Sequence, residues 1–186
     1  MEQPKTGQNT GVESGSFGKL PGHPQHFNVG VFDKWGVSMK ITVNIDGGSR
    51  GNPGPSAAAM VIIDEEGQIM ATKSKFLGPS FTNNFAEWSA LEGAVNALVY
   101  LAGEHEGLTA EVLADSELVV RQFNRQYKIK EPSLREIAER VWENLVMTPG
   151  LQITVKHVPR EENKLADAAV NKELDSYTEW LKQEEQ

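Results

Sequence analysis

Cysteine is absent from all 186 residues of the chain. The protein therefore forms no disulfide and no thiolate metal site, so any metal must be bound by oxygen or imidazole ligands. Long apolar runs are absent too, because a run such as residues 57–63 is far shorter than the ~20 residues that a membrane span needs. The first residues, Met1 to Pro4, lack the basic start and apolar core of a secretory signal. We therefore expect a cytoplasmic protein with no membrane partner.

Positive charge is also scarce. Lys and Arg number 18 against 26 Asp and Glu, which gives a formal net charge of −8. This balance argues against a nucleic-acid partner, because neutralisation of phosphates by Lys and Arg drives most non-specific binding. A cluster of acids that binds divalent cations would partly offset the deficit by reversing the local sign of the field. The hydrophobic content of 39% is typical of a globular chain with one core.

The domain organisation follows from a change of composition near residue 39. Residues 1–38 hold seven Gly and three Pro, so we predict a flexible extension. The apolar residues between Phe27 and Trp35 leave two alternatives, a disordered tail or a segment that binds a protein or nucleic acid. Residues 39–181 are expected to form one domain, and residues 182–186 a polar tail. We expect a monomer.

Apolar periodicity predicts an α/β fold. Alternation over residues 39–46 indicates a first strand, and further strands are expected at 57–63, 68–77, 110–114 and 151–158. Helices are expected from the caps at 82–84 to about 102, then at 116–125, 133–147 and 161–181, with Ser133 and Glu136 as a capping box. The first three strands would form an antiparallel meander and the last two would pair in parallel through helical crossovers. The prediction is a five-stranded mixed sheet flanked by helices.

Four carboxylates stand at unusual places in this pattern. Asp46 and Asp115 each end an apolar strand, and Asp46 precedes a glycine-rich run that reaches Gly54. Glu87 falls on the buried stripe of the first long helix, and Asp167 lies near the start of the last helix. Taken singly, each has an ordinary explanation as a turn residue, a helix-dipole residue or a partly buried acid with a partner. Together they predict a site for Mg²⁺ or Mn²⁺, because converging carboxylates without a basic partner repel one another unless a metal neutralises them.

The segments around these acids resemble the four successive motifs of type 1 ribonucleases H. The matching segments are 45–54, which reads IDGGSRGNPG, 82–87 (TNNFAE), 114–116 (ADS) and 163–167 (NKLAD). The resemblance covers roughly residues 39–175, and four ordered motifs at compatible spacing are a strong signal. It implies the ribonuclease H-like fold and endonucleolytic hydrolysis of the RNA strand of RNA–DNA hybrids, leaving 5′-phosphate and 3′-hydroxyl ends.

Residue roles follow from the same resemblance. It implies that Asp46, Glu87, Asp115 and Asp167 hold two Mg²⁺ ions, with Mn²⁺ as a substitute, around the scissile phosphate. Asp46 would bridge both ions. The implied substrate contacts are Gly47, Gly48, Ser49, Asn83, Asn84 and Glu87 on the RNA strand, Asn52 and Thr82 on the DNA strand, and Ser116 and Glu117 after the third acid. For the two asparagines, simple helix capping is an alternative, and both interpretations can hold together.

The segment before Asp167 departs from the family pattern. Many members carry a glycine-rich loop with a histidine there, whereas residues 156–163 contain Pro159 and no glycine. His157 is one candidate for the missing histidine, although strand alternation equally places it in or beside the sheet. Arg160 is the other candidate, because an arginine at this spacing can meet a phosphate oxygen.

Two further departures concern substrate affinity. Glu117 stands where many relatives have glutamine, and its charge would repel phosphate. Residues 126–132 are much shorter than the basic protrusion of some members and retain only Lys128 and Lys130. We therefore predict weak, salt-sensitive binding of the hybrid.

Two rival functions remain at this point. One is a nuclease of the same broad fold that acts on double-stranded RNA or branched DNA. The other is a non-catalytic hybrid-binding module, against which the presence of all four acids argues.

Overall fold

A computed structural model describes residues 39–184 of the chain. The predicted extension, residues 1–38, lies outside the described residues. The elements in chain order are β1 (Lys40–Ser49), β2 (Gly54–Ile63), β3 (Ile69–Phe81), α1 (Asn83–Glu104), β4 (Thr109–Ala114), α2 (Glu117–Phe123), α3 (Pro132–Val146), β5 (Gln152–His157), the 3₁₀ helix η1 (Arg160–Glu162) and α4 (Lys164–Glu184).

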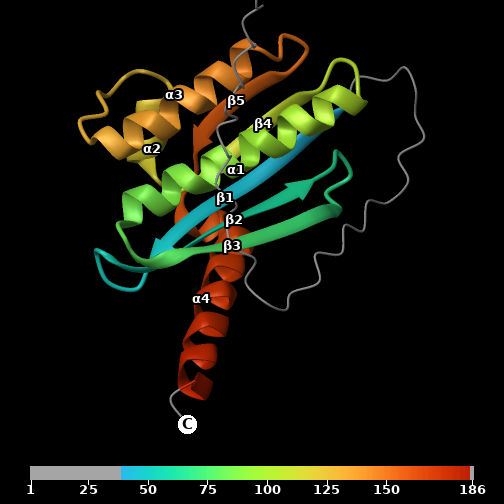
Figure 1. Ribbon diagram of the computed structural model, residues 1–186. Coiled ribbons are helices and arrows are strands. Elements are labelled where there is room, and N and C mark those ends of the chain that lie inside the picture. The colour runs from blue at the N-terminus through green and yellow to red at the C-terminus, as the bar shows by residue number, and fades with distance from the viewer. Residues whose placement is uncertain (1–38, 185–186) are drawn as a thin grey trace, which may run out of the picture.

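The five strands form one mixed sheet, as predicted, and their order across it is β3-β2-β1-β4-β5 (Figure 1). The pairs β1–β2 and β2–β3 are antiparallel, whereas β1–β4 and β4–β5 are parallel. Ile45 of β1 pairs in register with Ala114 of β4. Asp46 and Asp115 follow this pair, so they lie side by side where the parallel pairing of the two strands ends. Ligand sites form at such places in α/β sheets. The expectation that Asp46 ends its strand is wrong, because β1 continues to Ser49 through its pairing with β2.

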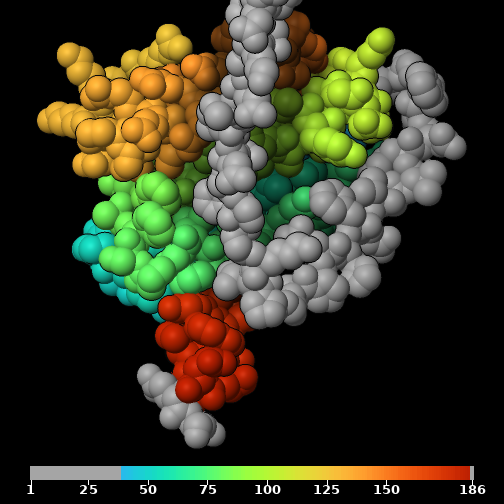
Figure 2. All heavy atoms as spheres, in the orientation of Figure 1, coloured from blue at the N-terminus to red at the C-terminus, as the bar shows by residue number. Residues whose placement is uncertain are grey.

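Helices cover both faces of the sheet. The main core joins the β1 residues Ile41, Val43 and Ile45 to apolar residues of α1, α2 and α3. On the other face, α4 packs Val170 and Leu174 against small β2 residues. Figures 1 and 2 show that α4 then projects beyond the sheet. Within residues 39–184, no helix is long and apolar enough to cross a membrane.

Several element boundaries differ from the prediction. The capping box at Ser133 is wrong, because α3 begins one residue earlier at Pro132, whose fixed φ suits the first helical position. Helix α2 ends at Phe123 rather than near Arg125, which adopts a left-handed φ of 59° incompatible with helix continuation. Helix α4 continues to Glu184, so residues 182–184 of the predicted tail are helical.

Gly47 permits a close approach between β1 and the start of α1. A Cβ atom added at Gly47 would lie 2.1 Å from the Ala86 carbonyl carbon and 2.2 Å from the Glu87 backbone nitrogen. Any side chain at this position would push the helix away from the strand. The glycine therefore brings the Asp46 end of β1 against the Glu87 turn of α1.

Candidate active site

Three of the predicted acids converge at the carboxyl edge of the sheet. Asp46 comes from β1, Glu87 from the second turn of α1 and Asp115 from the residue after β4. One carboxylate oxygen of each lies within 4.8 Å of the others. This spacing allows a single cation to contact all three side chains, and oxygen-only ligands suit a hard divalent ion.

Glu87 is the most deeply placed member of the cluster, with 6% of its surface exposed. Asn83 Nδ2 lies 3.5 Å from its Oε1, at the limit of a hydrogen bond. Its Oε2 is buried and has no hydrogen-bond partner within the described part of the chain. Because a buried, unsatisfied carboxylate oxygen is costly, this atom is a natural ligand for a cation.

Burial and mutual repulsion favour the protonated forms of two of these acids. Burial, then the charges of Asp115 and Asp167, raises the pKa of Asp46 to about 7. Burial, then the charges of Asp46 and Asp115, raises the pKa of Glu87 to about 9. Hydrogen bonding from the Gly47 backbone opposes both shifts. Without a cation, the cluster therefore retains protons near neutral pH.

Asp167 occupies the rim of the cluster, in the first turn of α4. Unlike the other three acids, it has a basic partner within residues 39–184: Arg160 donates a hydrogen bond of 2.5 Å to Asp167 Oδ1. The guanidinium side chain of Arg160 remains 76% exposed. The turn η1 makes this pairing possible, because it folds Arg160 back over the start of α4.

Asn163 is a buried site residue to which sequence reasoning assigned no role. Its side chain is fully buried, and its Nδ2 donates to the Ile45 carbonyl oxygen at 2.8 Å and lies 3.4 Å from Asp115 Oδ1. Its Oδ1 accepts a hydrogen bond of 3.1 Å from Asn44 Nδ2. The only signal in the sequence was its place in the fourth motif, because its partners are more than 40 residues away.

The glycine-rich loop and the start of α1 form one hydrogen-bonded surface beside the acids. Ser49 Oγ donates to the Phe81 carbonyl oxygen at 3.0 Å, and Asn52 Oδ1 accepts from the Asn83 backbone N–H at 3.1 Å. Thr82 is the N-cap of α1, because its Oγ1 accepts from the Phe85 N–H at 3.2 Å. The side chains of Asn83 and Asn84 are therefore not required as caps.

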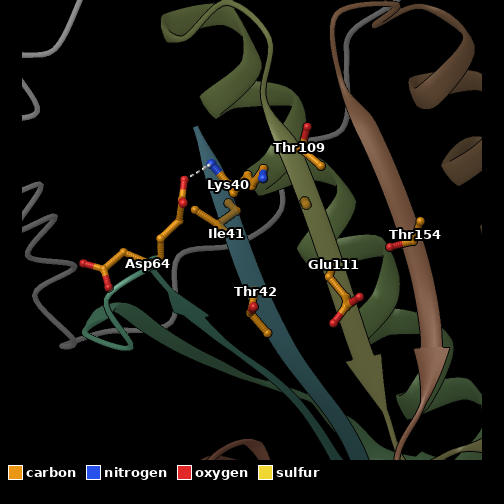
Figure 3. A pocket seen from close by; sticks show the side chains of 9 residues that line it. Lys40, Ile41, Thr42, Asp64, Thr109, Glu111 and Thr154 are labelled. Carbon is orange, nitrogen blue, oxygen red and sulfur yellow. Dashed lines mark hydrogen bonds between the residues drawn. The ribbon is translucent and has the colours of Figure 1, made fainter. Parts of the chain in front are cut away.

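A hollow of about 320 Å³ lies on this surface, with Asn52, Thr82 and Asn84 in its lining. A second hollow of about 280 Å³ lies at the opposite end of the sheet, between Lys40, Thr109 and Glu111 (Figure 3). Its Lys40 lies six positions before Asp46 along β1, a distance of about 20 Å at the usual rise per residue. The second hollow is therefore separate from the acid cluster.

Comparison with known proteins agrees with this arrangement. The family model described as reverse transcriptase-like matches residues 44–173. Ribonuclease HI of Halobacterium salinarum is 37% identical over 136 residues, which are 73% of this chain and 65% of that protein. Among solved structures, LC11-RNase H1 in complex with an RNA/DNA hybrid is 37% identical with a TM-score of 0.67, over 74% of this chain and 99% of that chain. The chain belongs to the type 1 ribonuclease H family.

A mycobacterial relative shows the same unit within a larger protein. The N-terminal RNase H domain of a bifunctional Mycobacterium tuberculosis protein is 31% identical, with a TM-score of 0.68 over 77% of this chain and 99% of that domain. The chain spans only 36% of the full mycobacterial protein, and slightly under two thirds of the H. salinarum protein. The similarity to ribonucleases H therefore concerns the described domain.

His157 and Arg160 are the two candidates for the role of the loop histidine found in other type 1 ribonucleases H. Of these two, only Arg160 contacts one of the four acids, Asp167. His157 is the exposed last residue of β5, paired in register with Ala114. Among residues 39–184, it makes no hydrogen bond or ion pair with any of the four acids. The alternative that placed His157 in the sheet is confirmed.

Two arginines, Arg121 and Arg125, lie just before residues 126–132, in which only Lys128 and Lys130 are basic. Glu117 pairs with Arg121, whose Nε and Nη2 donate to Glu117 Oε1 at 2.9 and 2.7 Å. The charge of Glu117 is therefore partly neutralised within α2. Arg121 also lies over the Tyr127 ring at 5.2 Å, and Arg125 lies over the Trp142 ring at 4.7 Å.

Because the pKa values of Asp46 and Glu87 are raised, the metal-free protein should lose stability as the pH rises. A folded-state pKa above the unfolded value means that stability is lost as pH rises from about 4 through the folded-state pKa. Asp46→Asn should therefore stabilise the protein relative to wild type at pH 8, by an amount of the order of 2 kcal/mol, but not at pH 4. Urea denaturation in EDTA at both pH values measures the difference.

The exposed acid Glu179 on α4 supplies the control, since Glu179→Gln should leave the pH dependence unchanged. Equal stability differences for Asp46→Asn at pH 4 and pH 8 would contradict the assigned electrostatics.

Proposed function

We propose that the protein is an endonuclease that hydrolyses the RNA strand of RNA–DNA hybrids, leaving 5′-phosphate and 3′-hydroxyl ends. The observation that carries the proposal is the convergence of Asp46, Glu87 and Asp115, with the buried Oε2 of Glu87 unsatisfied. Membership of the type 1 ribonuclease H family supports this class of reaction. A purely structural explanation would require a basic partner for these three acids, whereas Arg160 pairs with Asp167 instead.

The cluster suits two Mg²⁺ ions, with Mn²⁺ as a substitute, held by Asp46, Glu87, Asp115 and Asp167. The absence of cysteine and the carboxylate-only donor set favour hard ions of this kind. When bound, such ions supply activation of the attacking water and charge stabilisation at the leaving oxygen. Asp46, which is central among the acids, would contact both.

Arg160 serves the same reaction from the rim. Its hydrogen bond to Asp167 raises the pKa of the guanidinium further, so the side chain stays charged at any relevant pH. An exposed, charged guanidinium beside the acids can hold a phosphate oxygen of the substrate. Arg160 therefore binds and orients phosphate rather than moving a proton.

Recognition of the RNA strand requires groups that read the 2′-hydroxyl. The backbone of Gly47, Gly48 and Ser49, the side chains of Asn83 and Asn84 and the Glu87 carboxylate would make these contacts. The 3.5 Å approach of Asn83 Nδ2 to Glu87 Oε1 supports this assignment for Asn83. Asn52 and Thr82 line the neighbouring hollow and would contact the DNA strand.

Ser116 and Glu117, which follow Asp115 at the start of α2, would extend the same substrate surface. The H. salinarum and LC11 relatives carry ribonuclease H names, which supports a hybrid as the substrate. Monomeric state, cytoplasmic location and a partner for residues 1–38 stay predictions.

Matched duplexes test the substrate assignment. With Mg²⁺ or Mn²⁺, the protein should cut the RNA strand of an RNA–DNA hybrid and leave the equivalent RNA–RNA and DNA–DNA duplexes intact. Asp46→Asn should abolish cleavage while hybrid binding persists, because it removes a ligand charge and keeps the shape of the side chain. Gel analysis of end-labelled strands measures both results.

Faster cleavage of the RNA duplex would instead support a related nuclease with a different substrate. Hybrid binding without any cleavage by the wild type would support the non-catalytic alternative.

The position of Arg160 predicts a ranking of two substitutions. Arg160→Ala should lower kcat by about 10- to 100-fold, since it removes a charged phosphate contact at the acids. His157→Ala should have a smaller effect, because the imidazole makes no described contact with them. Steady-state cleavage of the hybrid compares the two variants, and a larger loss for His157→Ala would show that the histidine fills the role.

A further inference from the structure

Two asparagines form a hydrogen-bonded pair in the interior, directly behind the acid cluster. Asn44 lies on β1 and Asn163 lies between η1 and α4. Asn163 is fully buried and Asn44 is 5% exposed. Asn44 Nδ2 donates to Asn163 Oδ1 at 3.1 Å, across 119 residues of sequence.

Packing alone gives no reason for an amide at Asn44. Its neighbours in register are Val61 on β2 and Leu113 on β4, both apolar. A buried amide requires hydrogen-bond partners to offset its desolvation, whereas an aliphatic side chain would fill the same position without that requirement. The hydrogen bonds of the pair, rather than its packing, therefore account for the two amides.

The Ile45 carbonyl oxygen fixes the orientation of the Asn163 amide, because it can only accept a hydrogen bond. Asn163 Nδ2 therefore points toward this oxygen at 2.8 Å and toward Asp115 Oδ1 at 3.4 Å. The Oδ1 of Asn163 then faces Asn44, whose Nδ2 donates to it at 3.1 Å. Asn44 thus satisfies the buried acceptor of Asn163 in the orientation in which Asn163 can donate to Asp115.

Asn163 contacts the chain at three of the acids. Its side chain donates to the residue before Asp46 and lies next to Asp115. Its backbone oxygen accepts the Asp167 N–H at 3.2 Å, within the first turn of α4. One buried residue therefore ties β1, the end of β4 and the start of α4 together where their carboxylates converge.

We propose that Asn44 and Asn163 are positioning residues that hold Asp115 and Asp167 in register with Asp46 for divalent cation binding. This inference rests on the proposed function. Groups that hydrogen-bond to metal ligands orient them, and their loss typically weakens metal affinity or activity by about 10- to 100-fold. Neither asparagine touches the cation or substrate in this scheme.

The test replaces both amides by aliphatic side chains of similar size, in the variant Asn44→Leu/Asn163→Leu. Removing both partners keeps the interior filled and leaves no unpaired side-chain amide, although the Ile45 carbonyl oxygen and Asp115 lose a donor. The same fold with a lower melting temperature is therefore expected. Mn²⁺ titration calorimetry at a temperature where circular dichroism shows every protein folded should give an approximately tenfold or greater rise in Kd. For cleavage of the hybrid, kcat should fall while KM stays close to wild type.

A matched control comes from another asparagine pair in the same domain. Asn144 Nδ2 of α3 donates to Asn96 Oδ1 of α1 at 2.8 Å, on the exposed helical side. Asn96 lies nine residues after Glu87, about 13 Å further along the helix. Asn144→Leu should leave Mn²⁺ affinity and kcat unchanged.

Mn²⁺ affinity and kcat in the double variant equal to those of Asn144→Leu would overturn the inference. If the double variant fails to fold, the single change Asn44→Ala, which removes the hydrogen bond to Asn163 Oδ1, provides the same comparison. Failure of the wild type itself to bind Mn²⁺ and to cut the hybrid would overturn the proposed function, a distinct result. A merely structural pair would lower the melting temperature without changing Mn²⁺ affinity.

Discussion

Repulsion among carboxylates held at short range is the constraint on which the site depends. Asp46, Glu87 and Asp115 bring oxygens within 4.8 Å of one another at the edge of the sheet, where burial removes much of the screening by water. The raised pKa values of Asp46 and Glu87 express this cost. Folding energy from the surrounding core must hold the acids together, and a divalent cation would relieve the repulsion.

A few local features of the fold hold the three carboxylates together against their mutual repulsion. Parallel pairing of β1 with β4 sets Asp46 beside Asp115, and the missing side chain of Gly47 admits the Glu87 turn of α1. Asn163 joins these strands to α4. Outside the cluster, Arg121 pairs with Glu117 and partly neutralises the acid that follows Ser116.

Local patterns in the sequence predicted the elements, the mixed sheet and the cluster. The apolar stripe of α1 placed Glu87 on its buried side, and strand ends placed Asp46 and Asp115. Contacts between distant segments could not be predicted in this way. The Arg160–Asp167 pair depends on the path of η1, and the Asn44–Asn163 pair joins residues 119 positions apart. Ser133 failed as a cap because Pro132 begins the helix first.

Anomalous diffraction from crystals grown with Mn²⁺ tests the central claim most directly. The account predicts manganese peaks contacted by Asp46, Glu87 and Asp115, with the Oε2 of Glu87 no longer without a partner. Crystals of the folded protein in saturating Mn²⁺ that show no manganese at these carboxylates, or show it only elsewhere, would contradict the account.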